Sequence, residues 1–263
     1  MFRLQKALEK AKEKRAEVRG NTAHISPLEM ISYSQTRVVE LPKNVLEKNR
    51  IIASFHNDPR AQIFRTLRTK IIQKMRTNKW NTLAITSPSD EGGKSLIACN
   101  LAVALAMEVN QTVLLVDLNL RNPSVAKNFG MTPEKTIYDY LKGKAEPSEL
   151  MVNPGIERLV IVPGGIAEGN SSELLSSPRM KAFIRETKKR YKSRIVIYDL
   201  PAVLPTDDAL SVLGDMDAAL LVITEGQNNR EEIERARDLI SITNVLGSVL
   251  NKSTDKVIDT AQE

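Results

Sequence analysis

Short apolar runs alternate with amphipathic stretches along the chain from residue 81 onward. The apolar runs cover residues 82–87, 112–118, 158–164, 194–200, 218–224 and 245–251. Helical periodicity lies between most of them, over residues 94–109, 172–191 and 229–242. Continuously apolar strands are typical of a sheet covered on both faces, and strands interleaved with helices favour parallel pairing. The pattern therefore predicts an α/β fold with a doubly wound, mostly parallel sheet.

A long amphipathic helix is predicted directly before this region. Asp58 is placed to cap the helix N-terminus, and Pro59 stands at the first helical position. Apolar residues then recur every four positions, at Ile63, Leu67, Ile71 and Met75. Basic residues occupy the other faces, at Arg65, Arg68, Lys70 and Lys74. This periodicity indicates a helix with one apolar stripe.

The first 57 residues predict an N-terminal helical extension and a linker. Residues 3–19 carry a narrow apolar stripe on an otherwise charged helix, and residues 20–57 are polar, without clear periodicity. We therefore expect two parts, an N-terminal helix with a polar linker over residues 1–57 and an α/β domain over residues 58–263.

Composition narrows the class of protein. The chain has 263 residues, of which 27% are charged and 4% aromatic, and its net charge is +6. One cysteine, Cys99, excludes an internal disulfide, and only two histidines accompany it, which argues against a zinc site. No apolar run approaches the roughly 20 residues of a membrane span, and the charged N-terminus is unlike a secretory signal. We expect a cytoplasmic protein that binds no nucleic acid, since aromatic residues are scarce.

A loop with glycines and a lysine follows the first predicted strand. Residues 87–95 read SPSDEGGKS and match the phosphate-binding pattern GxxxxGK[ST], except that Pro88 replaces the first glycine. Such a loop presents backbone N–H groups to phosphate, while Lys94 reaches the β- and γ-phosphates and Ser95 binds Mg²⁺. The alternative is a simple glycine turn before a core helix. The position directly after a strand favours the phosphate site.

Two predicted strands end in acidic residues. Asp117 lies at the tip of the 112–118 strand, and Asp199 lies at the tip of the 194–200 strand. Phosphoryl transfer with Mg²⁺ needs one carboxylate near the ion and another that orients the attacking hydroxyl. A single aspartate at a strand end is more often a cap or turn residue. Two of them together with the glycine loop favour a catalytic site.

Four segments together resemble the bacterial tyrosine kinases of exopolysaccharide and capsule assembly, which are P-loop ATPases related to MinD and ParA. The segments are residues 86–106, 113–130, 170–184 and 195–210. The resemblance runs from about Arg60 to Lys252, and the short N-terminal helix is also similar. It implies a MinD/ParA-like P-loop fold, a tyrosine-kinase-like domain over residues 58–263, and Walker A, A′ and B motifs.

The resemblance also implies the site residues and the cofactors ATP and Mg²⁺. ATP would be bound by Ser89, Asp90, Glu91, Gly92, Gly93, Lys94, Ser95, Leu96 and Asn251. Catalysis would fall to Lys94, Asp117 and Asp199, and Mg²⁺ binding to Ser95, Asp117 and Asp199. In this scheme Asp117 acts at the tyrosine hydroxyl, and Asn251 lies where MinD-like relatives contact adenine. A strand-end turn is the alternative for Asn251, and Asp208 matches a family acid of open role.

Partners and location follow from the same resemblance. It implies protein tyrosine substrates and a membrane-bound polysaccharide co-polymerase that regulates chain length, which places the protein peripherally at the inner face of the bacterial membrane. In the family, a Glu-x-x-Arg-x-x-Arg helix joins subunits into a ring. Gln62, Arg65 and Arg68 occupy those positions here, so a homo-oligomer is one prediction and a solvated basic helix face is the other.

The sequence departs from the family at several positions. Glu91 puts a carboxylate near the phosphates, Asn119 replaces the second acid of the A′ motif, and Ala202 replaces a proline after Asp199. The family's C-terminal tyrosine cluster is missing, so we expect transfer to another protein or to an internal tyrosine such as Tyr33. A tyrosine kinase is the main hypothesis. The alternatives are a MinD/ParA-type switch ATPase without kinase activity and a catalytically weakened pseudokinase scaffold.

Overall fold

The computed structural model describes residues 36–55, 57–189 and 194–254. The chain divides into two units, residues 1–31 and 32–263, and all described residues lie in the second. The predicted helix over residues 3–19 and Tyr33 lie outside the described residues.

The described residues form an eight-stranded sheet in the order β1-β4-β5-β3-β6-β2-β7-β8. Neighbouring strands are parallel, except that β4 and β5 are antiparallel. The strands are β1 (Arg37–Val38), β2 (Thr82–Thr86), β3 (Thr112–Asp117), β4 (Val152–Asn153), β5 (Leu159–Val162), β6 (Arg194–Asp199), β7 (Ala218–Thr224) and β8 (Asn244–Asn251). The prediction of a mostly parallel sheet is confirmed.

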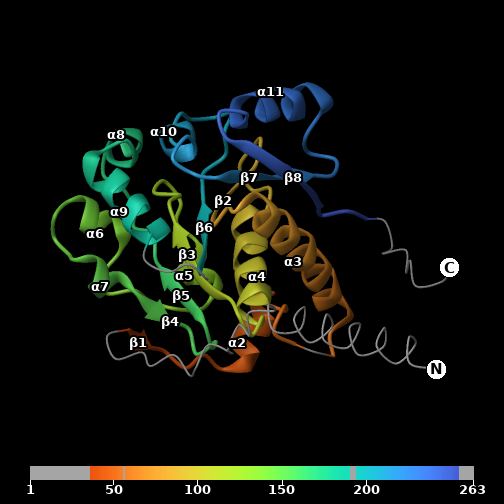
Figure 1. The fold of residues 1–263 in the computed structure, drawn as a ribbon, viewed down its shortest axis with the longest axis horizontal. Coiled ribbons are helices and arrows are strands. Elements are labelled where there is room, and N and C mark those ends of the chain that lie inside the picture. The colour runs from red at the N-terminus through yellow and green to blue at the C-terminus, as the bar shows by residue number, and fades with distance from the viewer. Residues whose placement is uncertain (1–35, 56, 190–193, 255–263) are drawn as a thin grey trace, which may run out of the picture. The chain divides into compact units, whose positions relative to one another are not determined.

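Helices cover both faces of this sheet (Figure 1). They are α2 (Lys43–Lys48), α3 (Pro59–Asn78), α4 (Lys94–Ala106), α5 (Val125–Asn128), α6 (Ile137–Leu141), α7 (Pro147–Leu150), α8 (Ser171–Leu175), α9 (Pro178–Lys189), α10 (Leu210–Leu213) and α11 (Arg230–Ile240). One apolar cluster joins α3 and α4 to alternate strand residues, and a second joins α6, α7, α9, α10 and α11 to the opposite sheet face. This is the doubly wound arrangement that the sequence predicted.

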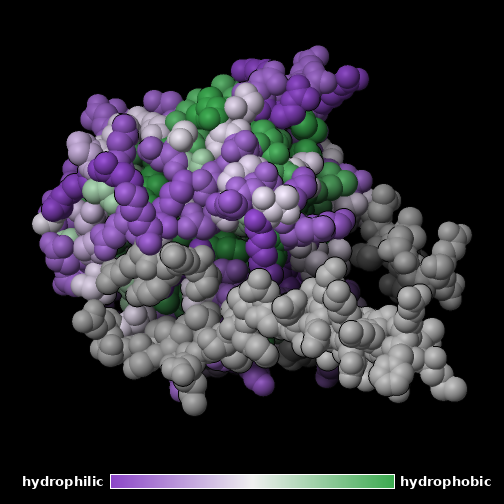
Figure 2. Space-filling view, viewed as in Figure 1, coloured by the Kyte–Doolittle hydropathy of each residue, from purple (hydrophilic) through white to green (hydrophobic). Residues whose placement is uncertain are grey.

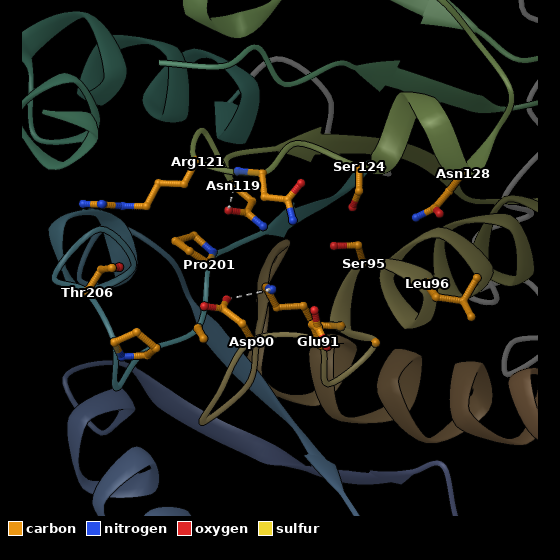
Figure 3. Close-up of a pocket in the computed structure, with 15 residues that line it drawn as sticks. Asp90, Glu91, Ser95, Leu96, Asn119, Arg121, Ser124, Asn128, Pro201 and Thr206 are labelled. Atoms are coloured by element: carbon orange, nitrogen blue, oxygen red, sulfur yellow. Dashed lines mark hydrogen bonds and ion pairs between the residues drawn. The ribbon is translucent and has the colours of Figure 1, made fainter. Parts of the chain in front are cut away.

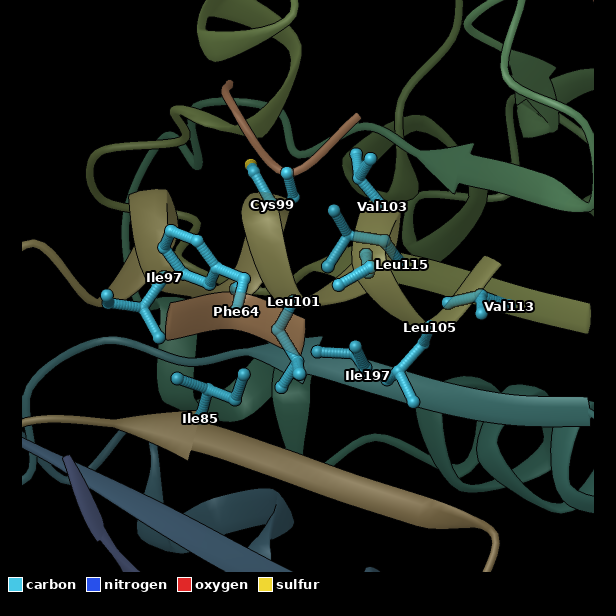
Figure 4. Packing of buried hydrophobic residues seen from close by; sticks show 14 of the residues in the cluster. Phe64, Ile85, Ile97, Cys99, Leu101, Val103, Leu105, Val113, Leu115 and Ile197 are labelled. Carbon is cyan, nitrogen blue, oxygen red and sulfur yellow. The ribbon is translucent and has the colours of Figure 1, made fainter. Parts of the chain in front are cut away.

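Helix α4 is the central helix of the first cluster. Leu101 and Leu105 on α4 lie close to Ile85 and Ile197 of the sheet (Figure 4). All these side chains are fully buried. Helix α4, which follows the glycine loop, is therefore anchored deep in the core.

The outer surface of α11 is hydrophilic (Figure 2), and the buried residues of that helix are Ala236 and Ile240.

The predicted helix α3 forms, but its buried stripe is shifted. The Asp58 side chain accepts a hydrogen bond from the Arg60 backbone N–H, as a cap does. Ile63 is 47% exposed, whereas its neighbour Phe64 is buried. The strict four-residue spacing selected the wrong residue in the first turns, because a period of 3.6 drifts relative to a period of 4.

The linker interpretation is wrong for residues 36–55. Ile51 and Ala53 are fully buried in the first apolar cluster. The Asn100 side-chain oxygen, on α4, accepts hydrogen bonds from the Ile52 N–H at 2.8 Å and the Ala53 N–H at 3.1 Å. Around Ile52 a buried side chain on α4, rather than a helix or strand, satisfies the backbone, so no repeating apolar pattern marks this part of the segment.

The predicted helix over residues 172–191 is interrupted. It consists of α8 and α9, which are separated by Ser176 and Ser177. Pro178 begins α9, and a proline disfavours helical backbone in the residue before it. Among the described helices, none has both the length and the apolar composition needed to cross a bilayer.

Candidate active site

The glycine loop connects β2 to α4 at the carboxyl edge of the sheet. Helix α4 begins at Lys94, and its N-cap Gly93 has a left-handed backbone with φ of 81°. A Cβ atom at Gly93 would lie 2.3 Å from the Asn251 side-chain nitrogen, and one at Gly92 would lie 3.0 Å from the Thr224 hydroxyl. Both glycines are therefore required by close packing against the ends of β7 and β8.

The backbone N–H groups at the start of α4 have no protein acceptor. Within the described part of the chain, the N–H groups of residues 91–95 donate no hydrogen bond. Unpaired N–H groups at a helix N-terminus attract anions, and phosphate in particular. The loop thus has the donor arrangement that a polyphosphate requires.

A cavity of about 480 Å³ opens in front of this loop. Its walls come from the glycine loop and α4, from the segment after β3, and from the segment after β6 (Figure 3). Ser95 and Ser124 lie across from each other in the cavity, and Asn119 and Arg121 extend from the segment after β3. The site lies beyond the carboxyl ends of the strands, where open α/β sheets bind ligands.

The three predicted catalytic residues are brought together: Lys94 lines the cavity, whereas Asp117 and Asp199 are buried and do not line it. Asp117 and Asp199 are direct register partners on β3 and β6, and both are fully buried. Lys94 is 5% exposed and lowers the pKa of each aspartate through its positive charge. The positive charge of Lys94 therefore acts on both buried carboxyl groups.

Asp117 holds the segment after β3. One carboxylate oxygen accepts a hydrogen bond from the Asn119 N–H at 3.1 Å. The other accepts from the Ser124 N–H at 2.9 Å and the Val125 N–H at 3.0 Å. Burial raises the pKa of Asp117 to about 6, and these backbone hydrogen bonds lower it in part. The pKa of this carboxyl group is therefore close to neutral pH, which suits exchange of a proton near pH 7.

Asp199 is the unpaired acid of the site. Both of its carboxylate oxygens are buried, and neither has a hydrogen-bond partner among the described residues. Burial and the neighbouring Asp117 raise the pKa of Asp199 to about 8, while Lys94 and the nearby Ser95 hydroxyl lower it. A buried, unpaired carboxylate beside a hydroxyl fits a divalent cation.

The residues present fit Mg²⁺ held together with a polyphosphate rather than by protein alone. Among the described residues, there is no group of three or more His, Cys, Asp or Glu side chains that would hold a metal. Mg²⁺ usually takes one or two protein oxygens and completes its shell with water and phosphate oxygens. Ser95 and Asp199 meet that requirement.

The other predicted nucleotide contacts fall into two groups. Those that line the cavity are Asp90, Glu91, Gly93, Lys94, Ser95 and Leu96. Ser89, Gly92 and Asn251 are not among its lining residues. The Ser89 hydroxyl instead accepts a hydrogen bond from Asn228, and Asn251 donates to the Gly92 carbonyl.

Arg121 is a cavity residue that the sequence reasoning missed. Its guanidinium donates to the fully buried Asp208 carboxylate at 2.8 and 3.2 Å, and Ser171 donates to the same carboxylate at 2.6 Å. Asp208 thus anchors an arginine at the cavity wall. The sequence did contain a signal for this residue pair. Arg121 lies in the segment that resembles the A′ motif, and Asp208 matches a family acid of open role.

The basic helix α3 makes contacts within its own subunit. Arg68 forms a 2.9 Å ion pair with Glu108 and donates to the Ala104 carbonyl. Arg65 donates to Gln62 and to the Phe55 carbonyl. These contacts fix the two arginines on the α3 surface, and a subunit contact through them stays a prediction.

Glu91 is exposed at the mouth of the cavity, in a left-handed conformation with φ of 58°. Its exposed carboxylate faces the same mouth through which a triphosphate must enter. Glu91→Gln is expected to raise ATP affinity about two- to threefold, because it removes one like charge across a solvated distance. Calorimetry at low salt measures the effect, which shrinks at high salt.

Glu47→Gln, on α2 outside the cavity lining, is the matched control for this prediction. It is expected to leave the ATP affinity unchanged. Equal affinities of the wild type and Glu91→Gln would show that the Glu91 carboxylate does not oppose the nucleotide.

The sheet, the glycine loop and the acids at adjoining strand ends define a P-loop nucleotide-binding protein. The chain is 30% identical over 199 residues to the tyrosine-protein kinase CpsD of Streptococcus agalactiae, which covers 74% of this chain and 84% of that protein. It is 29% identical over 209 residues to the tyrosine-protein kinase YwqD of Bacillus subtilis, over 78% of this chain and 86% of the relative. The chain therefore belongs to the bacterial tyrosine kinases. No protein-family model matches it.

Solved structures share the fold of this chain. The chimerical protein CapA2B2 superposes with a TM-score of 0.72 and 25% identity, over 83% of this chain and 94% of that one. The kinase domain of the Escherichia coli tyrosine kinase ETK superposes with a TM-score of 0.71 and 24% identity, over 84% of this chain and 92% of that one. The cell division ATPase MinD of Pyrococcus furiosus shares the fold, with a TM-score of 0.56 and 23% identity over 65% of this chain and 71% of that one.

Proposed function

We propose that this protein binds ATP with Mg²⁺ and transfers the γ-phosphoryl group to tyrosine residues of other proteins, and that it thereby regulates the chain length and export of a capsular polysaccharide or exopolysaccharide. The observation that carries the proposal is the buried group of Lys94, Asp117 and Asp199 behind a loop with unpaired N–H groups. Membership of the tyrosine kinase family supports the choice of acceptor.

Each residue of the group has a distinct task. The loop N–H groups and Lys94 would bind the phosphates. Ser95 and Asp199 would hold Mg²⁺, which would supply positive charge to balance that of the phosphates. Asp117 orients the tyrosine hydroxyl and accepts its proton. Burial raises the pKa of Asp117 above that of an ordinary aspartate, which makes its carboxylate a better proton acceptor.

The proposed partners follow from the family. A membrane-bound polysaccharide co-polymerase would recruit the protein to the inner face of the membrane and regulate it there. The basic face of α3 is the surface with the charge to meet an acidic tail or anionic lipid. A MinD-like nucleotide switch is the second candidate, and the shared fold favours it.

The test uses the purified full-length chain with Mg²⁺-ATP and a synthetic Glu–Tyr copolymer as acceptor. Phosphotyrosine on the copolymer is expected by immunoblot and mass spectrometry, and EDTA is expected to abolish it. ADP release without phosphotyrosine would replace the kinase by the nucleotide switch. Absence of ATP binding in calorimetry at millimolar nucleotide would leave a pseudokinase scaffold.

A further inference from the structure

We propose that the carboxyl ends of β7 and β8 act as a carbonyl clamp, which turns the peptide groups of the glycine loop so that their N–H groups face the cavity. The clamp consists of Thr224, Gln227, Asn251 and Lys252. These are positioning residues, since they act on phosphate through the loop. The inference rests on the proposed function, and it adds a second strand pair to the residues that shape the phosphate site.

Successive loop carbonyls accept hydrogen bonds from clamp side chains. The Asp90 carbonyl accepts from Gln227 at 2.9 Å, and the Glu91 carbonyl accepts from Lys252 at 2.9 Å. The Gly92 carbonyl accepts from Asn251 at 2.8 Å and from the Thr224 hydroxyl at 3.3 Å. No cavity-lining residue provides these donors, so the carbonyls are held on the side away from the cavity.

The direction of each carbonyl determines the direction of the next N–H group. In a trans peptide the C=O of one residue and the N–H of the following residue point in opposite directions. Carbonyls of residues 90–92 that are held against β7 and β8 therefore turn the N–H groups of residues 91–93 the other way. These N–H groups have no acceptor among the described residues.

The loop needs such an outside restraint. Glu91 and Gly93 both have left-handed backbone, with φ of 58° and 81°. For a residue with a Cβ atom, such as Glu91, this backbone conformation is unfavourable. Hydrogen bonds from residues more than a hundred positions away, such as Asn251, offset that cost.

The chain offers a matched pair of asparagines for the test. Asn244 begins strand β8 and Asn251 ends it, and each donates a side-chain N–H to a backbone carbonyl. Asn251 donates to Gly92 at 2.8 Å, whereas Asn244 donates to Asp217 at 2.7 Å, at the opposite end of the strand. Leucine has nearly the same shape as asparagine and removes the donor without adding charge.

Asn251→Leu is expected to weaken ATP binding about tenfold by calorimetry, which is the value of one lost hydrogen bond. Asn244→Leu is expected to leave ATP binding unchanged, although both variants lose one hydrogen bond and some thermal stability. Gln227→Leu, which removes the donor to Asp90, is expected to weaken ATP binding in the same direction. Equal weakening by Asn251→Leu and Asn244→Leu, or none by either, would overturn the clamp.

A nucleotide-free measurement separates this proposal from the proposed function. The amide NMR resonances of Gly92 and Gly93 are expected to move in Asn251→Leu and to stay in place in Asn244→Leu. Unmoved glycine resonances in Asn251→Leu overturn the clamp even if the wild type is an active kinase. If the wild type binds no ATP, the proposed function is overturned. The glycine resonances still test whether the clamp exists.

Discussion

Lys94→Met is expected to reduce tyrosine phosphorylation by about 10²–10³-fold, the usual effect of removing one preorganised charge that stabilises a transition state. Lys94 is 5% exposed and lines the cavity. Its loss also removes the charge that lowers the pKa values of Asp117 and Asp199. Both effects act in the same direction, since fewer deprotonated carboxylates remain for Mg²⁺ and for the tyrosine.

Initial rates of phosphotyrosine formation at saturating Mg²⁺-ATP measure this effect. Lys74→Met is the control, because Lys74 on α3 is a lysine outside the cavity lining whose ammonium donates to the Leu246 carbonyl on β8. It is expected to keep the wild-type rate. A Lys94→Met protein with more than a tenth of the wild-type rate would remove the lysine from the proposed mechanism.

Asp199→Asn is expected to stabilise the nucleotide-free protein while reducing kinase activity at least 10²-fold. The ordinary pKa of an aspartate carboxyl group is 3.8, whereas that of Asp199 in the fold is about 8. Between these values the folded wild type binds a proton that the unfolded chain releases, so its stability falls as the pH rises from about 4 to 8. Asparagine does not titrate, and the advantage of the variant therefore grows across this window, by up to about 4 kcal/mol between pH 5 and 8.

Thermal unfolding of both proteins at pH 5 and pH 8 without nucleotide tests the stability part. The melting temperature of Asp199→Asn is expected to exceed that of the wild type more at pH 8 than at pH 5, by several degrees. The activity part is measured with Mg²⁺-ATP at pH 7.5. A variant that is less stable than the wild type at pH 8 would show that the carboxylate has a partner in the nucleotide-free protein.

The central strands were predictable because each contains a continuous apolar run, Leu83–Ile85 in β2, Val113–Val116 in β3 and Leu159–Val162 in β5. β2, β3 and β5 are buried at every residue, as a sheet covered on both faces requires. The cap at Asp58 was equally readable, since it depends on two adjacent residues. The buried segment around Ile51 was not, because its backbone is satisfied by Asn100, whose position depends on the packing of α4.

The candidate site divides in the same way. The residue types and their order along the chain determined the glycine loop, Lys94 and an acid at the tip of each of two strands, because these signals are local. Only the tertiary structure decided that β3 and β6 are neighbours, which places Asp117 beside Asp199. Burial raises the pKa of both carboxyl groups, and the neighbouring Asp117 raises that of Asp199 further. It also decided the contact of Asn251 with the Gly92 carbonyl. Strand order and burial are properties of the whole packed sheet, and no short stretch of sequence encodes them.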